Sequence, residues 1–163
     1  MICGGSPCPG FSRLTNDKTT PMQRKNQSLI AAFATAIDLY RPKYGLLENV
    51  VGIVQPKAGR TEDVFSQLVC AIVGLGYQAQ FYLLDAWSYG SPQCRSRVFL
   101  VFAAPGLKLP EQPLPTHSHP KGTPNLGIGK LPTGDTMASR DLEVPTPFRF
   151  VSAEEATADL PEM

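Results

Sequence analysis

Long apolar runs are missing from this chain of 163 residues. No segment approaches the roughly 20 consecutive apolar residues that a helix needs to cross a bilayer. No basic stretch followed by an apolar one opens the sequence, so no secretory leader is predicted. These absences argue against a membrane partner and lead us to expect a soluble protein that works inside the cell.

An excess of charge is missing as well, because 15 basic and 14 acidic residues leave a net charge of +1. That balance neither favours nor excludes nucleic acid, since a local basic patch can bind phosphate. The chain has only four cysteines, without close repeated spacing, so we expect reduced thiols. No metal site is predicted, because this spacing does not match a zinc finger and both histidines lie in a proline-rich segment.

Strand and helix signals alternate over residues 1–104, and 42% of the chain is apolar. A helix is predicted up to Pro42, with an apolar stripe formed by Leu29, Phe33, Ile37 and Tyr40. The following run, residues 44–50, has the pattern of a strand buried on both faces. A second helix is expected from about Thr61, with a core stripe of Val64, Phe65, Leu68, Val69 and Ile72.

Two further strands are predicted over residues 77–86 and 97–104, separated by the segment WSYGSPQCRS. The order strand, helix, strand, helix, strand, strand predicts an α/β fold with a parallel sheet and one final hairpin strand. Residues 105–147 contain nine of the 16 prolines, which predicts a long surface loop or linker. Ser152 and Glu155 then stand at capping-box spacing, which predicts a short helix within residues 148–163.

Reactive side chains follow the ends of the predicted strands. Cys8 comes just after the first strand and Glu48 ends the second, while Arg95 and Arg97 begin the last. Because the carboxyl ends of parallel strands meet at one edge of a sheet, we expect these four side chains to share a rim. A thiol that is partly thiolate is a good nucleophile near neutral pH, and arginines can orient a carboxylate. Taken singly, each residue also has a purely structural explanation, such as a buried cysteine or a solvated strand edge.

Three motifs carry a resemblance to a known family. The segments GGSPCPGFS (4–12), ENV (48–50) and YGSPQCRSRVF (89–99) resemble, in order and spacing, the Pro-Cys, glutamate and Gln-x-Arg-x-Arg motifs of DNA (cytosine-5)-methyltransferases. The surrounding sequence is similar to the eukaryotic maintenance-type or fungal branch. The resemblance implies part of a Rossmann-like, S-adenosylmethionine-dependent methyltransferase fold. It implies a catalytic core in 1–104, the loop in 105–147 and the start of a truncated C-terminal segment in 148–163.

The resemblance also implies a mechanism on double-stranded DNA. The target cytosine is flipped out of the duplex, because its ring edge cannot be reached while it is stacked. Cys8 would then add to C6 of the ring while Glu48 hydrogen-bonds or protonates N3. The methyl group of S-adenosyl-L-methionine is transferred to C5, and Arg95 and Arg97 orient the glutamate and contact the cytosine.

Further roles follow from the same resemblance. Cofactor contacts or support for the cofactor site are assigned to Pro7, Leu29 and Asn49. Contacts to DNA are assigned to Ser12, Arg13 and Gln93. The family further implies a nuclear protein of DNA methylation and epigenetic silencing.

The chain departs from the family pattern in what it lacks. The Phe-x-Gly-x-Gly cofactor loop and the target-recognition region are not found, so we expect a fragment that is inactive without upstream and downstream parts of the same protein. Pro9 also replaces the common Gln after the catalytic cysteine. Two alternatives stay open at this point: a non-catalytic methyltransferase-like partner, and a tRNA cytosine-5 methyltransferase.

Overall fold

The structure is a computed structural model that describes residues 1–5, 21–55, 64–123, 133–134 and 144–161. They belong to two compact units. We call Met1–Tyr82 with Arg97–Glu111 the core unit, and Leu83–Ser96 with Gln112–Met163 the loop unit. Within the described ranges, no helix combines the length and apolar character that crossing a bilayer requires.

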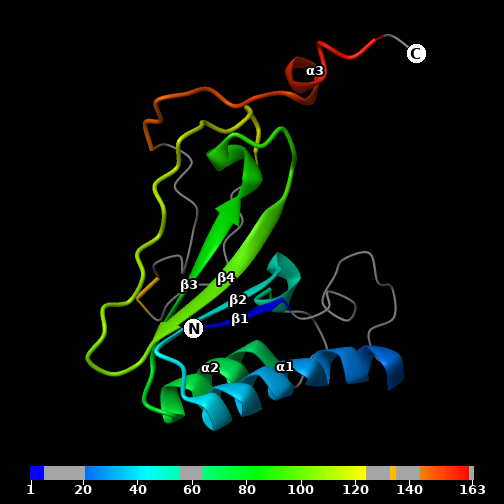
Figure 1. Ribbon diagram of the computed structural model, residues 1–163. Helices are drawn as coiled ribbons and strands as arrows, with labels where there is room; N and C mark the ends of the chain where they lie inside the picture. The colour runs from blue at the N-terminus through cyan, green and yellow to red at the C-terminus, as the bar shows by residue number, and fades with distance from the viewer. Residues whose placement is uncertain (6–20, 56–63, 124–132, 135–143, 162–163) are drawn as a thin grey trace. The chain divides into compact units, whose positions relative to one another are not determined.

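One four-stranded sheet organises the chain (Figure 1). Its strands, in the spatial order β1-β2-β4-β3, are β1 (Ile2–Gly5), β2 (Tyr44–Val50), β4 (Ser96–Ala103) and β3 (Gln78–Asp85). β1 pairs with β2 in parallel, and β2 pairs with β4 in antiparallel orientation. The predicted α/β fold is confirmed, and the sheet is mixed because the last strand enters it between β2 and β3. An interior place suits β4, since most of its side chains are buried.

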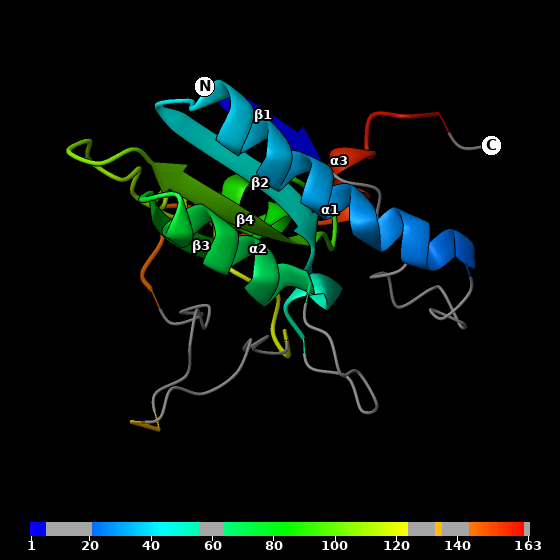
Figure 2. The same cartoon turned by 90° about the horizontal axis from the view of Figure 1, so that it is seen from below.

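Two helices lie side by side on one face of this sheet, as Figures 1 and 2 show. They are α1 (Pro21–Tyr40) and α2 (Val64–Gly74). Pro21 suits the first position of α1, where the missing N–H has no helical partner to lose. The helix ends before Pro42, as predicted. α2 turns its buried residues Phe65, Leu68 and Ile72 inward, as its apolar stripe predicts.

The predicted apolar stripe of α1 is wrong at both of its ends. Leu29 is 40% exposed and Tyr40 is 74% exposed, whereas Ile30 and Ile37 are buried. Residues seven apart lie nearly over one another on a helix, so Ile30 and Ile37 share the face that packs on the sheet. Leu29 is turned about 100° away from Ile30 and leaves that face.

The sequence predicted that β2 is buried on both faces of the sheet, and this prediction is wrong. In the structure, the burial of β2 alternates from one residue to the next. Gly45, Leu47 and Asn49 are buried, and the residues between them are partly exposed. This alternation gives β2 one face toward the helices and one face away from them.

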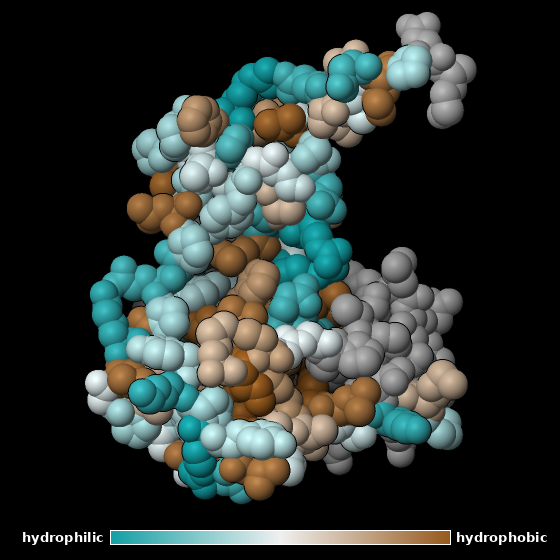
Figure 3. Space-filling model, viewed as in Figure 1, coloured by the Kyte–Doolittle hydropathy of each residue, from teal (hydrophilic) through white to brown (hydrophobic). Residues whose placement is uncertain are grey.

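Phe102 marks the centre of the core on the helix side. It is fully buried, and its ring meets Tyr77 and Phe33 edge-on at centroid distances of 5.3 and 6.2 Å. A Cβ on Gly45 would lie 1.9 Å from this ring, so only glycine leaves room for Phe102 on the paired strand. Apolar side chains also reach the surface, among them Leu39 and Val73 on the helices. Figure 3 shows brown residues beside teal ones on the molecular surface.

The loop unit has little regular structure among its described residues. A 3-10 turn, η2 (Ala86–Tyr89), follows β3, and Gly90 ends the turn at φ +85°, a left-handed conformation that favours glycine. The helix α3 (Ala153–Ala156) begins at Ser152, and the predicted capping box between Ser152 and Glu155 is confirmed. The described parts of 105–147 contain no helix or strand beyond one isolated bridge between His117 and Phe148.

Candidate active site

Glu48 and Arg97 form an ion pair on neighbouring strands. Their closest atoms, Glu48 Oε1 and Arg97 Nε, lie 2.8 Å apart. Register explains the meeting: Glu48 stands opposite Phe99 and Arg97 opposite Val50, so both side chains project from the same face of the sheet. Phe102 projects from the other face, toward α1, so the ion pair lies on the side that the helices leave uncovered.

Partial burial makes this pair different from an ordinary surface ion pair. The side chains of Glu48 and Arg97 are 29% and 21% exposed. An arginine in this position fixes the direction of the carboxylate. The carboxyl group is thereby held at the end of β2 in a defined orientation.

The end of β1 lies directly beside this carboxyl group. Gly5 pairs with Glu48 in the parallel ladder, and a Cβ on Gly5 would lie 3.9 Å from Glu48 Oε2. Cys8 follows Gly5 by three residues, and three residues extend no farther than about 11 Å. The covalent chain therefore sets an upper limit on how far the thiol-bearing residue can lie from this edge.

Asn49 supports the same strand end from the helix side. Its side chain is only 2% exposed, and its Oδ1 accepts a hydrogen bond from Val50 N at 2.8 Å. The following residues turn at once into the 3-10 helix η1 (Val51–Ile53). The geometry suits a residue that braces the strand end beneath Glu48.

Arg95 and Gln93 lie in the loop unit, and both are exposed. The carbonyl oxygen of Arg95 accepts a hydrogen bond from Ala86 N at 3.0 Å, which closes the base of the loop between β3 and β4. Gln93 donates from its side chain to Ser91 Oγ at 3.0 Å. These contacts give the loop a definite local shape.

The other predicted site residues divide into two groups. Leu29 lies on α1 and leaves 40% of its surface accessible, enough for an apolar contact to a ligand. Outside the described residues lie Pro7, Cys8, Ser12 and Arg13.

Sequence reasoning missed a polar cluster in the loop unit. His119 Nε2 lies 3.0 Å from Ser88 Oγ and 3.6 Å from Asp85 Oδ2. Asp85 is 3% exposed and Ser88 is 6% exposed, and burial lowers the pKa of His119. One sequence feature could have indicated this cluster: Asp85 stands at the end of an apolar strand, where a buried carboxylate needs polar partners. The histidines themselves were considered only as disfavoured metal ligands.

Comparison with known proteins identifies the family that the sequence resembles. The family described as C-5 cytosine-specific DNA methylase matches residues 1–147. The chain is 38% identical to DNA (cytosine-5)-methyltransferase 3 of Arabidopsis thaliana over 99% of its length, and 36% identical to DNA (cytosine-5)-methyltransferase 1A of Oryza sativa subsp. japonica, also over 99%. It is 34% identical to DNA (cytosine-5)-methyltransferase 1 of Mus musculus over its whole length. The matches cover 11%, 10% and 10% of these relatives, so the chain spans about a tenth of their length.

A solved structure shows the same fold. A DNA modification methyltransferase encoded within an E. coli prophage superposes with a TM-score of 0.58 at 22% sequence identity. The match covers 99% of this chain and 35% of that one. The mixed sheet with its two helices is therefore one part of a larger methyltransferase fold.

Proposed function

Because the chain belongs to the C-5 cytosine-specific DNA methylase family, we propose that it carries the cytosine-activating half of a DNA (cytosine-5)-methyltransferase. The reaction is the transfer of a methyl group to C5 of a cytosine flipped out of double-stranded DNA. Since the chain spans about a tenth of its relatives, we propose that it acts together with further parts of a longer protein. A nuclear location goes with this substrate.

The ion pair between Glu48 and Arg97 is the observation that carries the proposal. Cytosine is a poor electrophile until N3 receives a hydrogen bond or a proton, and a positioned carboxyl group supplies either. Arg97 holds Glu48 in one orientation, with their closest atoms 2.8 Å apart, on the face of the sheet opposite Phe102 and α1. If the carboxyl group rotated freely, it would seldom point at N3, and much of the rate gained by holding the two groups in the right geometry would be lost.

We assign the nucleophile to Cys8. Its thiolate would form a bond to C6, and the electrons of the C5–C6 double bond would move into the ring as Glu48 delivers its proton to N3. After methylation at C5, N3 would return its proton to Glu48, a base would remove the C5 proton, and the electrons of that C–H bond would reform the C5–C6 double bond as the C6–sulfur bond breaks and releases the thiolate. The short link from Gly5 to Cys8 supports this role, because Gly5 pairs with Glu48.

S-adenosyl-L-methionine, when bound, supplies the methyl group that C5 accepts. Among the described residues, the accessible surface of Leu29 fits an apolar wall for this cofactor. Asn49 fits the site as a brace, because its Oδ1 is already bonded to Val50 N. We assign the remaining wall of the cofactor site to Pro7, and contacts to DNA to Ser12, Arg13 and Gln93. Arg95 is assigned, with Arg97, to the catalytic set that orients the glutamate and contacts the target cytosine.

Covalent trapping tests the proposal in the full-length protein that contains this chain. DNA with 5-fluorocytosine at the target keeps the enzyme attached, because fluorine at C5 cannot leave as a proton does. We expect an adduct with the wild-type protein and with Cys70→Ala, which changes an exposed free thiol on α2, but none with Cys8→Ala. An adduct that survives Cys8→Ala would overturn the assignment, as would a wild-type protein that methylates tRNA and not DNA.

The role of the ion pair has its own test. Glu48→Gln keeps the size of the side chain but cannot transfer a proton, and we expect a loss of kcat of about 100-fold or more. The matched control is Glu111→Gln, which removes a carboxylate paired with Lys108 on the exposed surface of the core unit. Equal activity of Glu48→Gln and wild type would overturn the role of Glu48.

A further inference from the structure

The segment between residues 112 and 119, which we call the strap, lies against the loop formed by residues 86–95, which we call the motif loop. Both belong to the loop unit. The amides of Thr116 and His117 donate to the same carbonyl oxygen, Ser88 O, at 2.8 and 3.1 Å. The Tyr89 hydroxyl donates to Pro113 O at 2.9 Å. These bonds join residues at least 24 positions apart in the sequence.

The approach of the strap is close enough to restrict the sequence of the motif loop. A Cβ on Gly90 would lie 2.8 Å from the His117 ring, and the φ of Gly90 is +85°. Both facts require glycine at the turn. The motif loop therefore has a shape that depends on the strap beside it.

His119 closes the contact from the far end of the strap. Its Nε2 meets Ser88 Oγ at 3.0 Å and lies 3.6 Å from Asp85 Oδ2, and its side chain is 11% exposed. The other carboxylate oxygen of Asp85 accepts a hydrogen bond from Ser96 Oγ. Ser96 directly precedes Arg97 in the chain. The buried carboxylate thus links the end of β3, the start of β4 and the strap.

A hydrolase centre is the obvious alternative for a serine, a histidine and an aspartate in contact. The geometry contradicts it, because Ser88 and Asp85 both approach the same nitrogen of His119. Nucleophile activation of the serine-protease type needs the two partners on opposite ring nitrogens. The cavity beside the cluster, lined by Leu83, Leu84, Asp85, Ser88, Tyr89 and His119 among others, has a volume of about 40 Å³. A space of that volume holds a few waters.

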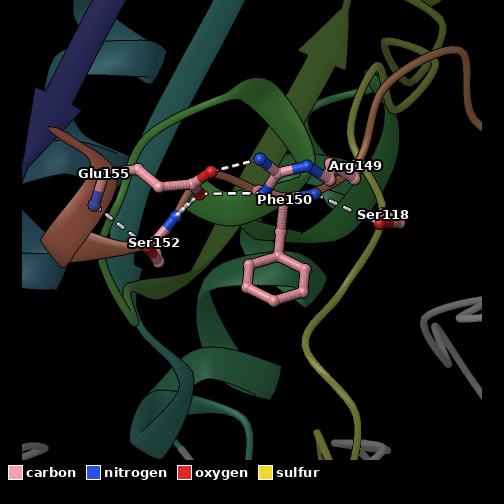
Figure 4. A network of polar contacts seen from close by, with 5 residues as sticks. All are labelled: Ser118, Arg149, Phe150, Ser152 and Glu155. Carbon is pink, nitrogen blue, oxygen red and sulfur yellow. Dashed lines mark hydrogen bonds and ion pairs between the residues drawn. The ribbon is translucent and has the colours of Figure 1, made fainter.

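The strap is itself held on its other side by the C-terminal segment. Ser118 N donates to Phe148 O at 2.9 Å, Phe148 N donates to Thr116 O at 3.1 Å, and Phe150 N donates to Ser118 Oγ at 3.2 Å. Figure 4 shows how Arg149, next to Phe150, reaches Glu155, whose carboxylate also bonds the backbone of Ser152. The strap is therefore fixed between two neighbours.

We propose that His119 is a positioning residue for the motif arginines: through Ser88 and Asp85 it holds the two ends of the motif loop, from which Gln93, Arg95 and Arg97 extend. The proposal rests on the proposed function for its catalytic consequence, since Arg97 orients Glu48 only if its strand starts in the right place. His119 acts on the reaction through the loop and touches no reacting atom.

The loop itself can be observed without any enzymatic assay. Trp87 is the only tryptophan of the 163-residue chain and lies in η2, next to Ser88. His119→Leu removes the polar contacts to Ser88 and Asp85 and keeps a side chain of similar size. We expect a shifted Trp87 emission and at least 10-fold faster hydrogen exchange of the Thr116, His117 and Ser91 amides, with unchanged exchange in β2. His119→Gln keeps a side-chain amide for Ser88, and we expect it to restore most of the wild-type exchange.

Two results would overturn the proposal. One is wild-type Trp87 emission and loop exchange in His119→Leu. The other is equal disturbance in His119→Leu and His119→Gln, which would show that the ring serves only as packing.

A kinetic experiment in the full-length protein tests the catalytic consequence. We expect His119→Leu to lower kcat about 10-fold or more with little change in the KM for DNA, and His119→Gln to recover most of it. A loss confined to KM would overturn the positioning role. If the wild-type protein transfers no methyl group, the proposed function fails, while emission and exchange still decide whether His119 holds the loop.

Discussion

The core unit and the loop unit are each stabilised internally by a different kind of interaction. In the core unit the fully buried side chains are almost all apolar, as Ile37, Leu100 and Phe102 illustrate. In the loop unit the buried polar side chains Asp85 and Ser88 take a comparable place, and single hydrogen bonds join distant segments. Apolar burial tolerates small shifts because it has no direction, whereas each polar contact depends on a particular pair of atoms. The difference predicts a graded response to substitution.

Phe102→Ala is expected to have the largest effect. It removes a ring with no exposed surface that packs against Tyr77 and Phe33, and it leaves a cavity between sheet and helices. We expect a loss of about 3–5 kcal/mol in the free energy of unfolding, measured by denaturant titration. Leu114→Ala, at a residue that is 83% exposed, should change it by less than about 0.5 kcal/mol. Similar values for the two variants would contradict the placement of the core.

Gly45→Ala tests the same core by adding volume. The new Cβ would lie 1.9 Å from the Phe102 ring, so the strand or the ring must move, at an expected cost of about 1–3 kcal/mol. Combined with Phe102→Leu, the same substitution should cost less than the sum of the single changes, because the smaller side chain leaves room. Strict additivity in the double-mutant cycle would show that the two residues do not meet.

Much of the core unit could be predicted from the sequence because its signals are local. The β2 strand was predicted with its observed bounds, and the buried stripe of α2 followed from helical spacing. The stripe of α1 was placed one residue off at Leu29, since a helix with apolar residues at both 29 and 30 has two possible stripes. In the folded chain the stripe that contains Ile30 packs against the sheet.

The candidate site was predictable only in part. Glu48 and Arg97 belong to recognisable motifs on strands, and β-sheet register brings them together. The contacts of His119 with Ser88 and Asp85 left no periodic trace, because they join segments 31 and 34 residues apart through single side chains. A proline-rich segment offers no hydrophobic pattern from which such a contact could be read.

The next largest effect is expected when the loop unit is titrated with acid, because it contains His119, whose side chain is only 11% exposed. Burial lowers the pKa of His119 in the folded chain, so the unfolded chain takes up a proton first as the pH falls below about 6.5. Stability contributed by neutral His119 is then present above that pH and lost as the pH falls through the folded-state pKa. Asp85 is the charged group facing the ring, and Tyr89 lines the adjoining cavity.

We expect the protection of the strap amides, which compares their exchange rate with that of an unstructured peptide at the same pH, to fall as the pH falls below about 6.5. The same amides in His119→Gln should show no such step. Side-chain NMR would give the His119 pKa directly. A pKa above 6.5 would show that attraction by Asp85 outweighs burial and would reverse the sign of the pH dependence.

The smallest effect is expected at the exposed end of the loop unit. Hydrogen bonds from Arg149, followed by the backbone hydrogen bond at Ser152, lower the pKa of Glu155 to about 2. Any stability from this carboxylate is present above about pH 4.5 and is lost as the pH falls toward 2. Arg149→Ala should return the pKa most of the way to its ordinary value, as read from the Glu155 side-chain resonances, whereas Lys108→Ala, which breaks a pair in the core unit, should leave it unchanged. Because both partners are exposed, Arg149→Ala should barely change the midpoint of denaturant unfolding at neutral pH. A large change in that midpoint would mean that this surface pair stabilises much more of the chain than the end of α3.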